Sequence, residues 1–394
     1  MKKVRYGVVG VGNQGSGYAG HFLRGSIENG ELTAICDLKP SRMEQLLDIF
    51  KDKPEAKNVR CFTDYKEMLI SGLCDAVLVV TPHYAHPEIT SAFLERGVHV
   101  LCDKPAGVYT KQVREMNEMA EKSSARFAMM FNQRTKAVYR KMREIIQEGG
   151  IGELQRVNWI ITDWYRTRAY YQNGDWRATW KGEGGGVLIN QCPHQIDLVQ
   201  WILGEMPVSV HGFCQYGRWH DIEVEDEVTA FFEYKNGATG VFITTTGEAP
   251  GTNRFEVSGT KGKLLCENQK LYWYKNEVDS LEFSQTCQSG FDQPPLQVVE
   301  VETDGKDSQH IGIINNFTNA ILGLEEQFVQ GVEGINGVEL MNAIELSGWK
   351  GGEKVMLPVN EDEYLAELEK RQKTSRAKTG VVETVVDNSM SFGS

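Results

Sequence analysis

The glycine-rich segment Gly7-Val8-Val9-Gly10-Val11-Gly12-Asn13-Gln14-Gly15 is the strongest indication of the fold. It contains the pattern G-x-G-x-x-G, placed between an apolar run at residues 4–9 and a helix-like segment at residues 14–24. Gly10 permits a tight turn, Gly12 lets the backbone approach a pyrophosphate, and Gly15 lets helix and strand pack closely. The N–H groups and dipole of the helix start hold an anion. We therefore predict a dinucleotide site at Gly10, Gly12, Asn13, Gln14 and Gly15, with an ordinary glycine-rich turn as the alternative.

Asp37 ends the second predicted strand, 25 positions after Gly12. A carboxylate there can accept hydrogen bonds from the ribose hydroxyls and repel a 2′-phosphate, which favours NAD as the cofactor. Just after Asp37 come Lys39, Ser41 and Arg42, which could instead bind a 2′-phosphate. NADP therefore stays as the less favoured alternative, and Arg42 belongs to the predicted cofactor site.

The surrounding sequence predicts an α/β fold with an N-terminal Rossmann domain. Apolar runs at residues 31–37, 75–81, 99–103 and 127–131 alternate with helical patterns at residues 41–50, 87–96 and 110–123. Strands that are apolar throughout and separated by helices indicate a doubly wound parallel sheet covered on both faces. We expect this dinucleotide-binding domain to span residues 1–130.

Residues 131–394 have a different pattern. Helices are expected at 135–148, 189–203, 310–324 and 337–347, and strands at 153–164, 208–215, 226–234, 239–246, 254–258, 263–274 and 354–358. Short turns such as Lys235-Asn236-Gly237 predict hairpins. We expect an α+β domain for substrate binding and oligomerisation, with a large, mainly antiparallel open sheet and residues 375–394 as an arm or tail.

Composition excludes several classes of function. Lys and Arg number 42 and Asp and Glu 54, for a formal charge of −12, and no Lys/Arg run is present; nucleic acid is therefore not an expected partner. No apolar stretch reaches the roughly 18 residues of a membrane helix, and the start lacks the apolar core of a signal peptide. The eight cysteines are scattered without a CxxC pair, which favours reduced thiols in the cytoplasm and no metal site.

Two further motifs carry a family resemblance. Thr81-Pro82-His83-Tyr84-Ala85-His86 follows the third apolar strand and Asp103-Lys104-Pro105 follows the next. With the glycine turn they resemble the nucleotide-binding half of the Gfo/Idh/MocA oxidoreductases, which include sugar and inositol dehydrogenases. Gly184-Gly185-Gly186, leading into a helix with His194 and Asp197, extends the resemblance into the second half. The family's usual tripeptide is Glu-Lys-Pro, so Asp103 is a departure.

The resemblance implies roles for these positions. Lys104 matches the family's lysine near the nicotinamide and the reacting hydroxyl, where an ammonium can stabilise alkoxide character or share in proton transfer. Thr81, Pro82, His86 and Asp103 match positions at the cofactor. His194 is the better proton acceptor, because neutral imidazole suits a base near neutral pH.

Asn190, His194 and Asp197 stand at i, i+4 and i+7, so one continuous helix would place them on one face. The family often has Asp, His and Asp there. Asn190 is a second departure, because its amide can bind a hydroxyl but cannot act as a base. Which part of the proton transfer belongs to Lys104 and which to His194 therefore stays open. A polar helix face packed on the sheet is the alternative for the trio.

The segment from Trp164 to Trp180 is expected to be a loop over the active site. Its aromatic side chains can cover the C–H patches of a sugar ring, while charged and amide groups bind hydroxyls. Packing in the core is the alternative for these aromatics, Trp180 above all. His310 is a weaker candidate for the site. The predicted substrate-binding residues are Lys104, Asp163, Tyr165, Arg166, Arg177, Asn190, His194 and Asp197.

We expect an NAD(P)-dependent dehydrogenase of a secondary hydroxyl on a sugar, glycoside or cyclitol, with Lys104 and His194 as catalytic residues. One alternative retains the cofactor and uses transient oxidation for elimination or hydrolysis. Another is a sugar or nucleotide sensor without catalysis, which the presence of both Lys104 and His194 disfavours. The resemblance also implies a homo-oligomer, a dimer or a tetramer.

Overall fold

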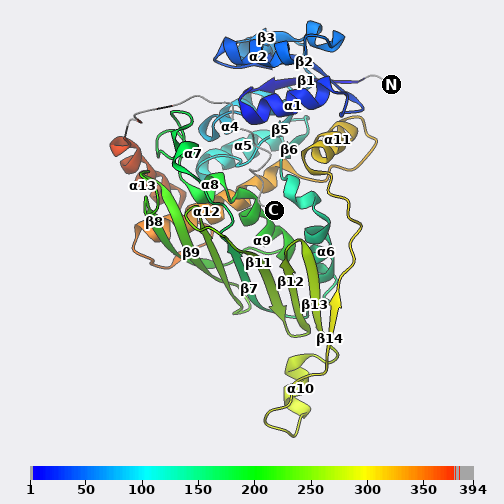
Figure 1. Ribbon diagram of the computed structural model, residues 1–394, viewed down its shortest axis with the longest axis vertical. Helices are drawn as coiled ribbons and strands as arrows, with labels where there is room; N and C mark the ends of the chain where they lie inside the picture. The colour runs from blue at the N-terminus through cyan, green and yellow to red at the C-terminus, as the bar shows by residue number, and fades with distance from the viewer. Residues whose placement is uncertain (1–2, 377, 379–380, 382–394) are drawn as a thin grey trace.

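The first half of the chain forms a six-stranded parallel sheet in the order β3-β2-β1-β4-β5-β6 (Figure 1). The computed structural model describes residues 3–376, 378 and 381. The strands of this sheet are β1 (Val4–Val9), β2 (Gly30–Cys36), β3 (Arg60–Phe62), β4 (Ala76–Val79), β5 (His99–Cys102) and β6 (Phe127–Met129). All four residues of β4 are buried, as expected for a parallel sheet covered on both faces. The strand order reverses between β1 and β4, where doubly wound sheets bind dinucleotides.

Helices of the first half connect these strands. They are α1 (Asn13–Leu23), α2 (Pro40–Ile49), α3 (Tyr65–Ile70), α4 (His86–Glu95) and α5 (Thr110–Lys122), with single 3-10 turns η1 (Pro54–Asn58) and η2 (His83–Ala85). A helix from far along the chain, α11 (Gln309–Ile321), packs against the same sheet (Figure 1). The Tyr6 hydroxyl of β1 lies 2.8 Å from Thr318 Oγ1 of α11. The first half of the chain is thus completed by a helix from the second half.

The second half builds a nine-stranded sheet in the order β14-β13-β12-β11-β7-β10-β9-β8-β15. Strands β7 and β10 pair in parallel and the other neighbours are antiparallel. Along β9 buried and half-buried residues alternate, as in a sheet with one face in the core. The strands are β7 (Leu154–Ile161), β8 (Ser209–Tyr216), β9 (Glu225–Glu233), β10 (Thr239–Thr245), β11 (Asn253–Gly259), β12 (Gly262–Glu267), β13 (Lys270–Asn276), β14 (Leu296–Glu300) and β15 (Val355–Met356).

Three helices, α6 (Ala137–Gln147), α9 (Pro193–Leu203) and α12 (Gly334–Trp349), lie between the two sheets and against the larger one (Figure 1). Helix α9 buries ten of its eleven residues, so it forms the centre of this layer. The remaining elements are α7 (Arg168–Gln172), α8 (Val187–Asn190), α10 (Ser280–Thr286), α13 (Glu361–Thr374), η3 (Asn132–Thr135) and η4 (Gly331–Glu333). The predicted Rossmann domain and the mainly antiparallel open sheet are both confirmed.

The structure corrects several predicted elements. The single helix expected at residues 189–203 is wrong: α8 ends at Asn190 and α9 begins at Pro193, because Pro193 has no N–H to continue the helix. The strand expected at residues 263–274 is a hairpin, since Asn268 and Gln269 take φ of 50° and 59° between β12 and β13. The loop at residues 164–180 contains α7, and α10, β14 and α13 lie where no element was predicted.

Most of the predicted tail at residues 375–394 lies outside the described residues. Ser375 and Arg376 are described, and both bind the Glu223 carboxylate. This part of the tail is therefore attached to the second domain.

Candidate active site

The glycine turn between β1 and α1 has the geometry that a pyrophosphate requires. Gly10 has φ of 91°, and a Cβ there would lie 2.4 Å from the Val80 carbonyl oxygen. A Cβ on Gly15 would lie 1.8 Å from the Gly10 oxygen, so Gly15 permits close packing of helix and strand. A Cβ on Gly12 meets no atom within 4 Å, which leaves open space in front of the first turn of α1. Since N–H groups of a first helical turn lack intrahelical partners, these residues fit a dinucleotide phosphate.

Asp37 lies next to this turn, directly after β2. Its carboxylate accepts the Val11 N–H at 3.0 Å and the Lys39 N–H at 2.9 Å. Arg42 Nη1 lies 3.6 Å from the same carboxylate. The structure therefore brings together the acidic and basic groups that the sequence places at the ribose, and Asp37 also holds the glycine turn.

Lys104 follows the end of β5, the strand that pairs with β4. Its ammonium donates to the backbone oxygen of Asn190 at 3.0 Å. Burial lowers its pKa, while the charges of Asp103 and Glu183 oppose that shift. The pKa of Asp103 is raised by burial, and Tyr18 donates to this carboxyl at 3.4 Å. A buried amine near two carboxylates is typical of a group that binds or transfers a proton.

The ring of His86 joins the two loops that carry the family motifs. Its Nδ1 lies 2.7 Å from the Pro105 oxygen and its Nε2 lies 2.7 Å from the Thr81 oxygen. Thr81 and Pro82 follow β4, while Lys104 and Pro105 follow β5. His86 therefore sets the spacing between these loops, and burial lowers its pKa.

His194 lies in the first turn of α9 and is only 5% exposed. Burial lowers its pKa well below the usual value, and the charge of Lys104 adds to this effect. Among the described residues, its Nδ1 has no hydrogen-bond partner. His310, which stacks near Tyr18 at 5.5 Å, also acts on His194, and burial lowers its own pKa to about 4. His194 is thus a neutral imidazole within the electrostatic reach of Lys104.

Tyr170 on α7 is the centre of a polar network beside Lys104. Its hydroxyl accepts from Arg177 Nη1 at 2.7 Å and from Gln191 Nε2 at 2.9 Å, and donates to Asn190 Oδ1 at 3.3 Å. The Asn190 amide in turn donates to Glu183. This network binds both the oxygen and the nitrogen of the Asn190 side-chain amide. The backbone oxygen of the same residue holds Lys104.

Glu183 is a buried carboxylate that the sequence did not single out. It accepts the Ala178 N–H at 2.5 Å and lies 3.9 Å from Arg177 Nη1. Burial raises its pKa, and Arg177 opposes that shift. Its position next to the three glycines was the available signal, but its partners Ala178, Arg177 and Asn190, all within seven residues, lie in or beside an irregular segment whose conformation no periodicity predicts.

The loop at residues 164–180 places the other predicted substrate ligands. The Arg166 guanidinium lies over the rings of Trp164 and Tyr170, at 5.7 and 5.1 Å. Tyr165 is 51% exposed. Burial raises the pKa of Asp163, whose Oδ1 has no hydrogen-bond partner among the described residues. Trp180, by contrast, packs against Trp349 at 5.6 Å, so it belongs to the core.

The C-terminal segment reaches this loop, which the sequence did not indicate. The Lys378 ammonium donates to the backbone oxygens of Tyr171 and of Gly174, the latter at 3.1 Å. Glu223 accepts from both Trp180 N and the Ser375 hydroxyl. The loop is therefore held by hydrogen bonds to residues near the end of the chain.

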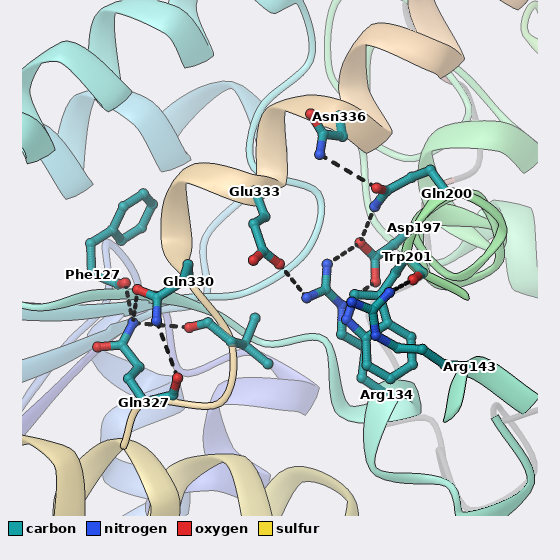
Figure 2. Close-up of polar contacts among 11 residues, drawn as sticks. Phe127, Arg134, Arg143, Asp197, Gln200, Trp201, Gln327, Gln330, Glu333 and Asn336 are labelled. Atoms are coloured by element: carbon teal, nitrogen blue, oxygen red, sulfur yellow. Dashed lines mark hydrogen bonds and ion pairs between the residues drawn. The ribbon is translucent and has the colours of Figure 1, made fainter. Parts of the chain in front are cut away.

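Asp197 is held in a buried ion pair (Figure 2). Its two oxygens accept from Arg134 Nη2 at 2.6 Å and Nε at 2.7 Å, and both side chains are 1% exposed. Arg134 also binds Glu333 of η4, as Figure 2 shows. Because the helix is interrupted before Pro193, the helical spacing that predicted a shared face with Asn190 does not apply. Asp197 has a structural role here, and its contact with substrate stays a prediction.

Metal ligands, membrane spans and cysteines of the described residues are the remaining features. No group of three or more His, Cys, Asp or Glu side chains among them could hold a metal ion. No helix in the described part is long and apolar enough to cross a membrane. All eight cysteines are free thiols.

Comparison with known proteins places the chain in a family. The model of an oxidoreductase family with an NAD-binding Rossmann fold matches residues 4–131, and that of the GFO/IDH/MocA C-terminal domain matches residues 139–265. The chain belongs to the Gfo/Idh/MocA oxidoreductase family.

Individual relatives are more distant. Inositol 2-dehydrogenase of Rhizobium meliloti (strain 1021) is 23% identical over 334 residues, covering 84% of this chain and 89% of the relative. D-glucoside 3-dehydrogenase of Escherichia coli (strain K12) is 30% identical over 225 residues, 52% of this chain and 60% of the relative. The WlbA dehydrogenase from Bordetella pertussis, solved with NADH and UDP-GlcNAcA, superposes with a TM-score of 0.74 at 23% identity, covering 91% of this chain and all of the other. At that identity the superposition shows the fold.

Proposed function

We propose that the protein oxidises a secondary hydroxyl of a sugar, glycoside or cyclitol. The family makes it an NAD(P)-dependent dehydrogenase of the sugar and polyol class, in keeping with relatives named for inositol and D-glucoside. The observation that carries the proposal is that the buried Lys104 ammonium, held by the Asn190 backbone oxygen at 3.0 Å, is near enough to act on the buried, neutral ring of His194. An ammonium beside a neutral imidazole supplies an oxyanion stabiliser and a base in one site.

In the proposed mechanism, His194 takes the proton of the substrate hydroxyl. Lys104 donates a hydrogen bond to the same oxygen and stabilises the negative charge that develops there. Asn190 keeps Lys104 in place through its backbone oxygen. The bound nicotinamide supplies the hydride acceptor. Because this site is buried, its electrostatic interactions are stronger than they would be in water.

The chain's own residues account for binding of the cofactor. The pyrophosphate is held by the first turn of α1 together with Gly10, Gly12 and Gly15. The Asp37 carboxylate accepts hydrogen bonds from the ribose hydroxyls. The carboxylate of Asp37 favours NAD over NADP. We expect Asp37→Ser to lower kcat/KM for NAD and to shift the NAD/NADP preference about tenfold or more toward NADP, a change of about 1.4 kcal/mol. A preference that stays unchanged would contradict this assignment, and Asp48→Ser, on the exposed side of α2, is the control.

The substrate set supports a polyhydroxylated ligand. Asn190, Arg166 and Arg177 offer hydrogen bonds to hydroxyls, and Tyr165 and Tyr170 offer aromatic faces. Arg177 and Tyr170 already bind each other, so this part of the site is organised before substrate arrives. Such preorganisation lowers the entropy cost of binding.

A panel assay tests the function directly. Purified protein with NAD should form NADH with at least one cyclitol, free sugar or glycoside of the panel. Redox catalysis without net NADH would favour the retained-cofactor alternative, and cofactor binding without oxidation of any polyol would favour the sensor. Either of these outcomes overturns the proposed net oxidation.

We also propose two domains, residues 1–130 and 131–394, in a cytoplasmic homo-oligomer. Strand β6 ends at Met129, the free thiols suit a reducing compartment, and exposed apolar side chains such as Leu296 and Val298 lie on edge strand β14. Light scattering of the purified chain would measure the oligomeric state, and a monomer at all concentrations would contradict this expectation.

A further inference from the structure

Two glutamates outside the proposed reaction bring their carboxyl groups together in the interior. Glu225 of β9 is 0% exposed and Glu345 of α12 is 3% exposed, and the Glu225 carboxyl lies near enough to raise the pKa of Glu345. The pair lies next to the glycine turn before α8, because a Cβ on Gly185 would lie 2.8 Å from Glu345 Oε1. Buried carboxyl groups are rare unless partners satisfy them.

One oxygen of each carboxyl holds a neighbouring element. Glu225 Oε1 accepts the N–H groups of Gly186 at 2.8 Å and Leu188 at 3.1 Å, at the start of α8. Glu345 Oε2 accepts the hydroxyl of Tyr364 of α13 at 2.5 Å. The pair therefore joins β9, α12 and α13 to α8, the short helix that ends at Asn190.

The other oxygen of each carboxyl has no remaining donor. Among the described residues, Glu225 Oε2 and Glu345 Oε1 are buried without a conventional partner. A proton between the two groups satisfies both oxygens, because a protonated carboxyl donates to a carboxylate. Two ionised groups would instead repel each other and leave two desolvated oxygens unpaired.

We propose that Glu225 and Glu345 share one proton in the folded protein, carried by Glu345, and that this proton positions α8 and through it Asn190 and Lys104. Glu345 is the proton carrier because Glu225 accepts two backbone N–H bonds that favour its ionised form, whereas Glu345 accepts a single hydroxyl. Both glutamates are positioning residues.

The surrounding charges agree with this assignment. Burial, then the charge of Glu225, raises the pKa of Glu345 well above its usual range, and burial raises that of Glu225 to about 7. Arg371 is a cation acting on the pair, and Glu183 adds negative charge, which opposes ionisation of both glutamates. The titratable and charged groups that face the pair are Glu183, Tyr84 of η2, Cys214 and Tyr216 of β8, and Tyr364 and Arg371 of α13.

Glu345→Gln tests the shared proton, because the amide donates a hydrogen bond at every pH. A carboxyl with a raised folded pKa stabilises the protein fully below its unfolded pKa, and this stability is lost as pH rises through the folded pKa. Relative to Glu345→Gln, the unfolding equilibrium constant of the wild type should therefore rise by up to about tenfold per pH unit above about pH 5. Thermal unfolding from about pH 5 to about pH 9 measures this as a widening difference in Tm.

Glu353→Gln, at an exposed glutamate, is the matched control, and its Tm should follow that of the wild type. A constant Tm difference between Glu345→Gln and the wild type across this range would overturn the proposal. Infrared spectroscopy of the wild type at neutral pH is a second test that needs no variant. It should show a protonated carboxyl band, and its absence would also overturn the shared proton.

The effect on turnover rests on the proposed function, whereas the two tests above do not. With substrate and NAD, the alkaline loss of the single-turnover rate should move to higher pH in Glu345→Gln while NAD affinity stays unchanged. An identical alkaline limb in both proteins would show that the shared proton does not position Lys104. If no substrate is oxidised by the wild type, the proposed function fails while the Tm and infrared results still decide the shared proton.

Discussion

At the residue scale, the sequence located the groups that belong to a motif and missed groups such as Glu183 and Tyr170, which lie in segments without a periodic pattern. Gly10 and Gly15 have the close backbone contacts that the motif requires, and Lys104 lies where its motif predicts, at the end of β5. Glu183 and Tyr170 were not predicted as central because their partners, such as Asn190 and Arg177, approach only in the folded chain. Asp197 was predicted at the substrate, but the structure gives it a buried partner, Arg134, that is 63 residues away.

The pH dependence of turnover follows from the two proposed catalytic residues. Burial lowers the pKa of His194 below the usual value of about 6.5, so the neutral base persists below that pH. Burial also lowers the pKa of Lys104. As the pH rises, the ammonium therefore loses its proton before the usual value of about 10.4 is reached. As the pH is lowered from neutral, we expect kcat/KM to stay level through about pH 6.5 and to fall only at lower pH. An acid limb centred above that value, in a pH–rate profile at saturating NAD, would contradict the role of His194.

Asp197→Ala separates a structural role from a role in substrate binding. Removing it leaves the buried Arg134 with its Glu333 contact alone, and breaking a buried ion pair costs about 3–5 kcal/mol. We expect that loss in urea unfolding of the variant. Asp48→Ala removes an exposed pair with Lys51 and should change stability by no more than about 1 kcal/mol. A variant as stable as the wild type would show that the Asp197 pair contributes nothing.

At the scale of elements, periodicity predicted the types of most strands and helices but not every boundary. Pro193 divides the helix expected at residues 189–203, and the hairpin turn at Asn268 and Gln269 divides a predicted strand. In each case the predicted element ran across a local break, which is the proline in the first and the polar run Glu267-Asn268-Gln269-Lys270 in the second. The packing of α11 against the first sheet could not be read from periodicity, which says nothing about which sheet a helix covers.

Fixation of the 164–180 loop by the C-terminal segment yields a prediction at this scale. Lys378→Met removes the contacts with the backbone oxygens of Tyr171 and Gly174. Hydrogen bonds to charged groups contribute about 1.5–3 kcal/mol, so we expect KM to rise about tenfold while kcat changes less than about twofold. Trypsin should also cut faster at Arg166 and Arg177. Lys373→Met, at an exposed residue of α13, is the control, and equal KM values and cleavage rates for both variants would refute the loop contact.

At the scale of the whole molecule, two sheets and the helices between them bring the site together (Figure 1). The glycine turn and Lys104 come from the first sheet, while His194 and Asn190 come from α9 and α8 beside the second. The two-part architecture was predictable from composition and pattern, because each sheet has its own periodicity. The approach of Lys104 to Asn190, 86 positions apart, required the folded structure. The net charge of −12 describes the surface and says little about this buried cationic site.

In the proposed mechanism, Lys104 and His194 perform the proton chemistry of a hydride-transfer reaction. The most direct measurement is the single-turnover rate of NADH formation from the best polyol substrate, in the wild type, Lys104→Ala and His194→Ala. Each substitution should slow this step at least about a hundredfold, the usual contribution of a positioned acid–base group, while NAD affinity measured by fluorescence stays unchanged. Near-wild-type rates in both variants would contradict the account.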